Sequence, residues 1–138
     1  MSSIYRQLEI DVPADHVWSA LADVGALHTR LVQGFVVDTK LEGNERLVTF
    51  ANGMAVTERI VSLDQANMRL SYTVIAGRAS HHHAAVQVHP LSSSRCRVVW
   101  VTDVLPDELA GPIGEMVNAG VAAMKRTLET SYLHGSDA

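Results

Sequence analysis

The chain has 138 residues, a hydrophobic content of 47%, a charged content of 19% and a net charge of −4. This length suits one domain over residues 1–138, and the acidic balance argues against nucleic-acid or membrane-surface partners, which favour basic proteins. A single cysteine excludes an internal disulfide, and with no signal-peptide pattern and no apolar run long enough to insert into a membrane, we expect a soluble cytoplasmic protein.

The first elements in the chain are a strand and a helix. Residues 3–12 alternate between apolar and polar, which indicates a half-buried strand, with Arg6 as the exception on the apolar side. From Pro13 onward apolar residues recur at helical spacing, and we expect a helix whose first position is Pro13. Gly25 interrupts this pattern and leaves a second short helix over about residues 26–31.

Six segments rich in strand-forming residues follow between residues 34 and 105, and each ends in a short turn. The segments are FVVDTKL, ERLVTFA, MAVTERIVSL, MRLSYTVIA, HHHAAVQVHPL and RCRVVWVTDVL. The second ends at Asn52-Gly53, a dipeptide typical of hairpins. Short turns between consecutive strands predict an antiparallel meander.

The last predicted element is a long amphipathic helix over about residues 107–133. Its apolar stripe consists of Ile113, Met116, Val117, Gly120, Val121, Met124 and Leu128. The predicted fold class is therefore α+β: a curved seven-stranded antiparallel sheet around a long C-terminal helix, with two short helices after the first strand. A bent sheet cannot lie flush on a straight helix, so we expect a pocket between them.

This order of elements resembles the START-related (SRPBCC) superfamily, the helix-grip fold, which includes polyketide cyclase/dehydrase and lipid-transport proteins and the plant abscisic acid receptors. VPADHVWSALAD is similar to the opening P-A-x-x-V-W helix, VTERIVSLDQANMRLSYTVIAG to the next strand pair, and VQVHP to the following strand. The similarity covers nearly the whole chain. It implies a helix-grip fold with a ligand pocket, but no single activity, because members share the pocket and little else.

Two segments depart from the family pattern. The second short helix commonly ends in a W-x-P-like turn, and here the sequence is LHTRLVQG. Abscisic acid receptors carry a Gly-Leu-Pro-Ala gate before the E-R strand, whereas this chain has NGMA, Asn52–Ala55, without a proline. This difference argues against a receptor-style gate.

Three adjacent histidines lie on one predicted strand, where neighbours point to opposite faces. His82 shares its face with Val86 and Val88 and is expected to enter the pocket, while His81 and His83 face solvent. A protein zinc site needs three or four ligands, so this split predicts no metal, and we expect no cofactor. His82 is either a hydrogen-bonded core residue or a pocket group that contacts ligand or moves a proton. The resemblance favours the pocket, because a similar position lines that of the receptors.

Glu58 lies on the same inward face as Val56. Burying an unpaired carboxylate is costly, so Glu58 must be paired, hydrated or protonated. One alternative is a pocket group, as the matching glutamate faces the cavity in the receptors. The other is half of an ion pair with Arg46 or Arg6.

Tyr72 shares an inward face with Val74, and buried tyrosine hydroxyls usually find a partner. Glu58, Tyr72 and His82 lie on three consecutive predicted strands. We therefore expect them to converge in the pocket.

The last strand permits two registers. The face of this strand that contains Trp100 is the more apolar one, and Arg95 and Arg97 lie on the other face. We therefore place Trp100 in the pocket. The resemblance to the receptors would allow the other register, with Val101 and Asp103 inside.

Three residues of the closing helix are expected to roof the pocket: Met116, Gly120 and Met124. Methionine suits a wall that adapts to varied ligands, and plain core packing is the alternative. The sequence contains no glycine-rich phosphate motif, H-E-x-x-H, G-x-S-x-G or C-x-x-C pattern. Cys96 is expected to be a buried, inert thiol.

The expected function is binding, in transport or sensing, of a hydrophobic small molecule such as a lipid, polyketide or aromatic metabolite. The alternative is a polyketide cyclase or dehydratase in which His82 and Glu58 act as general base and acid. The predicted ligand-binding residues are Glu58, Tyr72, His82, Val56, Val74, Trp100, Met116, Gly120 and Met124.

Overall fold

The computed structural model describes residues 2–135. The elements are, in chain order, β1 (Ser2–Ile10), α1 (Ala14–Ala22), a π-helical turn η1 (Leu27–Leu31), β2 (Val36–Glu42), β3 (Glu45–Phe50), β4 (Ala55–Asp64), β5 (Arg69–Ala76), β6 (His81–Pro90), β7 (Cys96–Leu105), a 3₁₀ turn η2 (Asp107–Leu109) and α2 (Ala110–Gly135). Within these residues no helix is both long and apolar enough to cross a bilayer.

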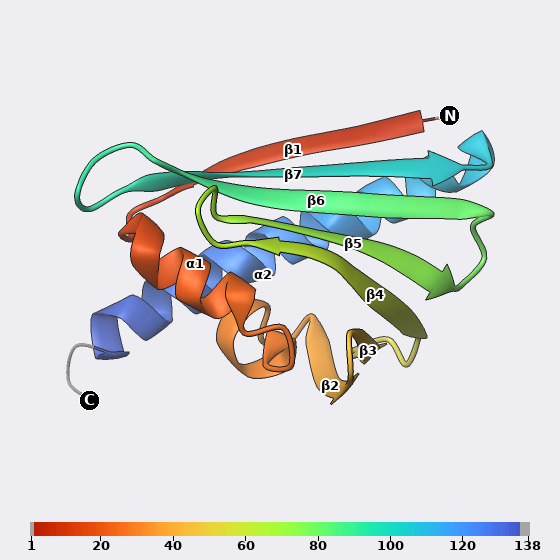
Figure 1. The fold of residues 1–138 in the computed structure, drawn as a ribbon, viewed down its shortest axis with the longest axis horizontal. Helices are drawn as coiled ribbons and strands as arrows, with labels where there is room; N and C mark the ends of the chain where they lie inside the picture. The colour runs from red at the N-terminus through yellow and green to blue at the C-terminus, as the bar shows by residue number, and fades with distance from the viewer. Residues whose placement is uncertain (1, 136–138) are drawn as a thin grey trace.

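The strands form one antiparallel seven-stranded sheet in the order β1-β7-β6-β5-β4-β3-β2. Strands β2 to β7 are the predicted meander, and β1 closes the sheet beside β7. Figure 1 shows α2 running across one face of the curved sheet, with α1 beside it. The predicted α+β helix-grip architecture is confirmed.

Irregularities in strand pairing account for much of the curvature. Extra residues interrupt the pairing at Val37 on β2, at Val61 on β4 and at Ile75 on β5. A bulge bends its strand and increases the local twist. Strand β4 therefore turns away from the straight axis of α2.

Two local features differ from the sequence prediction. Pro13 precedes α1 rather than beginning it: its ψ of 144° is extended, and its carbonyl accepts hydrogen bonds from the His16 and Val17 amides. The loop between β3 and β4 spans four residues, 51–54, instead of two. Gly53 has a φ of +90° there, which favours glycine, and the Met54 amide donates to Asn52 Oδ1 at 3.0 Å.

The core lies between the sheet and α2. Its most deeply buried members include Ile10, Val17, Val98 and Leu128, each at 0% exposure. Arg6, the exception in the pattern of β1, reaches α2, where its Nε donates to Asn118 Oδ1 at 2.6 Å.

Candidate functional site

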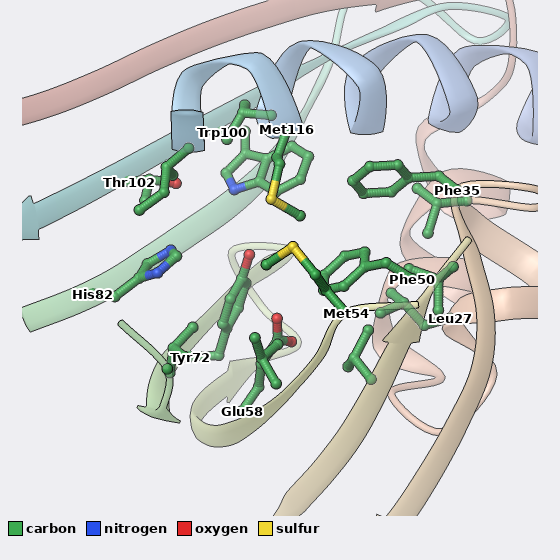
Figure 2. Close-up of a pocket in the computed structure, with 18 of the residues that line it drawn as sticks. Leu27, Phe35, Phe50, Met54, Glu58, Tyr72, His82, Trp100, Thr102 and Met116 are labelled. Carbon is green, nitrogen blue, oxygen red and sulfur yellow. The ribbon is translucent and has the colours of Figure 1, made fainter. Parts of the chain in front are cut away.

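A cavity of about 440 Å³ lies between the concave face of the sheet and α2 (Figure 2). Most of its wall is apolar, including Val56 and Val74 from the sheet and Met116 and Met124 from α2. The cavity exists because the bent strands diverge from a straight helix. All four of these side chains, which the sequence places in the pocket, line the cavity.

One polar part of the wall is a buried ion pair. Arg46 and Glu58 are cross-strand neighbours on β3 and β4, and Arg46 Nε donates to Glu58 Oε1 at 2.8 Å. Their side chains are only 3% and 8% exposed. Arg46 also donates to the Val24 carbonyl at 3.2 Å, and its guanidinium lies 5.3 Å from the centre of the Tyr72 ring. This position is compatible with a cation–π contact.

Glu58 therefore combines the two alternatives that the sequence left open. It lines the cavity, and it is paired with Arg46 and not with Arg6. Burial raises the pKa of the Glu58 carboxyl, and the charge of Arg46 acts in the opposite direction. Within the described residues the second carboxylate oxygen makes no hydrogen bond, so it remains able to accept one from a ligand.

Tyr72 is buried and lines the cavity beside this pair. Figure 2 shows its hydroxyl directed into the cavity, and within residues 2–135 no group accepts a hydrogen bond from this hydroxyl. Burial, and next the negative charge of Glu58, raise the pKa of Tyr72, while Arg46 and the Trp100 indole oppose this rise. The hydroxyl is therefore protonated at neutral pH and can donate.

On β7 the structure places Trp100 and Thr102 inward, on the cavity wall. Asp103 lies on the opposite face, where it accepts a hydrogen bond from Ser3 Oγ at 2.6 Å. The register chosen from composition therefore holds over the alternative with Val101 and Asp103 inside. The indole Nε1 of Trp100 is buried without a hydrogen-bond partner in the described part of the chain.

The strand pleat separates the three histidines of β6. His82 lines the cavity, His81 is exposed, and His83 shares a 2.9 Å hydrogen bond with Thr73 Oγ1. The His82 ring has no hydrogen-bond partner in residues 2–135, so it is not the hydrogen-bonded core histidine of the first alternative. Burial first, and then the nearby His81, lower the pKa of His82, which is therefore neutral at pH 7. Over the same residues no three His, Cys, Asp or Glu side chains are grouped to hold a metal ion.

Gly120 does not line the cavity, in contrast to the prediction from its place on the apolar stripe. A Cβ atom at this position would lie 2.9 Å from the Trp100 ring and 3.3 Å from the Phe35 ring. The absence of a side chain lets both rings pack directly against α2. Gly120 thus acts on the site through the position of Trp100.

Sequence reasoning missed several lining residues on the early elements, among them Leu31 of η1, Phe35 and Phe50. The sequence prediction includes Arg46 only as a partner for Glu58. Arg46 alternates with the buried Val48 on β3, however, and this alternation indicates an inward position.

The loops at one end of the cavity also line it. They include Asn52 and Met54 of the loop between β3 and β4, where the family pattern is broken, and Arg78 of the loop between β5 and β6. Met54 is 43% exposed at this end. The cavity is thus bounded there by loops and not by the sheet.

Cys96 lies outside the cavity wall and is buried. Burial raises its pKa to about 11, so the thiol is not ionised at neutral pH and does not serve as a nucleophile.

Comparisons with solved structures give the same fold. A protein from Thermobifida fusca is 28% identical, with a TM-score of 0.74 and coverage of 93% of both chains. Norcoclaurine synthase from Thalictrum flavum is 18% identical, with a TM-score of 0.75, 98% of this chain and 96% of that chain covered. The di-domain ARO/CYC BexL of the BE-7585A biosynthetic pathway is 19% identical, with a TM-score of 0.79, 95% of this chain and 47% of that chain covered.

A comparison with curated proteins finds no match. The family model described as polyketide cyclase/dehydrase and lipid transport matches residues 1–130. This match covers nearly the whole chain and agrees with the helix-grip architecture and its internal cavity. The chain therefore belongs to the polyketide cyclase/dehydrase and lipid transport family.

Proposed function

We propose that this protein binds a hydrophobic small molecule in the cavity between the sheet and α2. The observation that carries the proposal is a cavity of about 440 Å³ whose mostly apolar wall contains a few inward polar groups. This volume falls within the usual range for small-molecule sites, about 300–1,000 Å³. Family membership supports the same broad role.

The two kinds of wall have different roles in this proposal. Val56, Val74, Met116 and Met124 remove the apolar body of the ligand from water, which supplies most of the affinity. A few polar groups orient it: Glu58, Tyr72, His82 and Trp100. Oriented polar contacts of this kind distinguish a ligand site from an unfilled core.

A matched pair of substitutions on β4 tests the proposal. Val56→Phe places a ring in the cavity, whereas Val61→Phe makes the same change at a side chain that is 57% exposed. The uncharged dye N-phenyl-1-naphthylamine, whose fluorescence rises in apolar surroundings, reports binding. We expect wild type and Val61→Phe to bind equally and Val56→Phe to bind about ten-fold or more weakly. Equal binding by Val56→Phe, or no binding by wild type, would contradict the proposal.

A second candidate function is proton-transfer catalysis of the cyclase or dehydratase kind. The observation that favours it is His82, which is neutral, faces the cavity and has no partner within the described residues. In this candidate His82 removes a proton from the carbon beside a ketone. Glu58, whose pKa burial raises, donates to the oxygen from its protonated form, in which it no longer carries the charge that pairs with Arg46. BexL, described as an ARO/CYC protein, shares the fold.

Deuterium exchange tests this candidate without knowledge of the natural substrate. We expect wild type to accelerate exchange at the enolisable carbon of 1-tetralone in D₂O, measured by proton NMR. His82→Gln should remove the acceleration, and His89→Gln, at an exposed position on the same strand, should retain it. Exchange no faster than in buffer would reject the enzyme and leave the binding role.

A further inference from the structure

We propose that Trp100 and Tyr72 together form a two-donor site for a neutral carbonyl oxygen of the ligand. This inference rests on the proposed function, since it names the chemical group that the same cavity recognises. Its starting point is the indole N–H of Trp100, which is buried without a partner in residues 2–135. An indole N–H can only donate, and a buried donor left without a bond costs free energy.

The second donor is the Tyr72 hydroxyl. Burial keeps it protonated, and no described side chain or backbone group accepts its hydrogen. On the strand ladder Tyr72 faces Ala84, and Trp100 faces Val86, two residues further along the same strand. The small Ala84 side chain leaves space above it, and Figure 2 shows the hydroxyl and the indole facing the same part of the cavity.

The Trp100 indole and the Tyr72 hydroxyl lie close together. The Trp100 indole lies near enough to lower the pKa of Tyr72, yet Trp100 Nε1 has no partner with hydrogen-bond geometry. An oxygen atom placed between them could accept from both. A carbonyl oxygen has two lone pairs and suits this arrangement.

The charges around the two donors favour a neutral carbonyl over a carboxylate. Arg46, whose guanidinium lies 5.3 Å from the centre of the Tyr72 ring, is already paired with Glu58 at 2.8 Å, so the two charges offset each other. His82 is neutral at pH 7. A ligand carboxylate would lose its hydration without gaining an unpaired cation at this point of the wall.

Fluorene and 9-fluorenone provide the test, because they share a rigid ring system and differ at the carbonyl. We expect wild type to bind fluorenone about three- to ten-fold more tightly than fluorene in calorimetric titrations, the effect of one or two hydrogen bonds. Tyr72→Phe and Trp100→Phe should each reduce this ratio, because each removes one of the two donors. The infrared carbonyl stretch of bound fluorenone should lie at lower frequency in wild type than in either variant.

Two controls match these variants. Trp18 is also buried with an unpartnered indole N–H but lies outside the cavity wall, and Tyr5 is exposed. Trp18→Phe and Tyr5→Phe should therefore keep both the affinity ratio and the carbonyl frequency. The thermal midpoint of each variant reports whether it is folded.

The outcomes separate this inference from the proposed function. Equal affinity for the two probes, or a carbonyl frequency that neither substitution moves, overturns the two-donor site while the hydrophobic binding site stands. Tighter binding of fluorene-9-carboxylate than of fluorenone would show that the site prefers an anion to a neutral carbonyl, and this result also overturns the inference. Absence of binding by all three probes contradicts the proposed function itself.

Discussion

The two ends of the space between the sheet and α2 differ sharply. At the packed end, defined by Ile10, Val17, Val98 and Leu128, every side chain is fully buried. At the hollow end, defined by the cavity, side chains such as Trp100 are only partly buried although they face the same helix. The same sheet and helix therefore enclose a solid core at one end and a cavity at the other.

Two structural features produce this difference. Helix α1 contributes side chains to the packed end and contacts β6. It thereby fills the space between the sheet and α2 at this end. At the hollow end the bulges on β4 and β5 bend the sheet, and η1 and the neighbouring loops line the space without filling it. The hollow end is instead reinforced by the Arg46–Glu58 ion pair. The packed core and the cavity that we propose as the ligand site thus lie at opposite ends of one interface.

Breaking the ion pair should have the largest effect. Glu58→Ala leaves the Arg46 guanidinium buried and unpaired, and we expect a loss of about 3–5 kcal/mol in the free energy of unfolding, measured with urea. The control is Glu45→Ala, which removes the exposed partner of Arg59 on the same two strands and should cost at most about 1 kcal/mol. Equal losses in the two variants would show that the hollow end does not depend on its buried charges.

Truncation of side chains compares the two ends directly. Leu128→Ala opens a void at the packed end, and we expect a loss of about 2–5 kcal/mol in unfolding free energy. Met116→Ala enlarges a cavity that already exists, and we expect a smaller loss of about 1 kcal/mol. Affinity for N-phenyl-1-naphthylamine should change only in Met116→Ala. A larger loss of stability at Met116 than at Leu128 would reverse the comparison.

Adding one methyl group to α2 sharpens the comparison further. Gly120→Ala places a Cβ atom 2.9 Å from the Trp100 ring, and the displaced ring should cost about 1–3 kcal/mol of stability. Gly114→Ala, on the same helix, meets only Arg6 Nη2 at 3.7 Å and should be neutral or stabilising. Urea denaturation of the two variants measures the difference. A stable Gly120→Ala protein with unchanged Trp100 fluorescence would contradict this role of Gly120.

The smallest expected effect concerns pH. The folded state holds the pKa of His82 below its ordinary value of 6.5, so the unfolded chain binds the proton more readily. Stability should therefore decrease as the pH falls below 6.5 and continue to decrease until the folded-state pKa is passed. His82→Gln should weaken this decrease in thermal midpoint without abolishing it, because burial also lowers the pKa of His16. The exposed His89→Gln is the control, and an identical pH profile for both variants would argue against a buried neutral His82.

The sequence predicts the fold well because its signals are local. Period-two alternation, short turns and the apolar stripe of α2 each act within one element, and they identify all seven strands and the long helix. The face assignments of Trp100 and His82 follow from the same alternation, since a strand shows one set of side chains to each face.

The parts of the site that the sequence does not predict depend on contacts between elements. Gly120 lies on the correct helix stripe, but only the positions of Trp100 and Phe35 show that it packs beneath rings instead of lining the cavity. The choice of Arg46 over Arg6 as the partner of Glu58 depends on the register of β3 and β4. The bulges on β4 and β5, which help to open the cavity, have no clear local signature.

The central claim is that the hollow end holds the ligand, and the methionine methyl groups test it most directly. Met54, Met116 and Met124 line the cavity, whereas Met68 lies outside it, near Trp18. In protein labelled with ¹³C at the methionine methyl groups, titration with N-phenyl-1-naphthylamine should shift the three cavity resonances and leave Met68 unchanged. A shift at Met68 with the three cavity resonances unmoved would contradict the account.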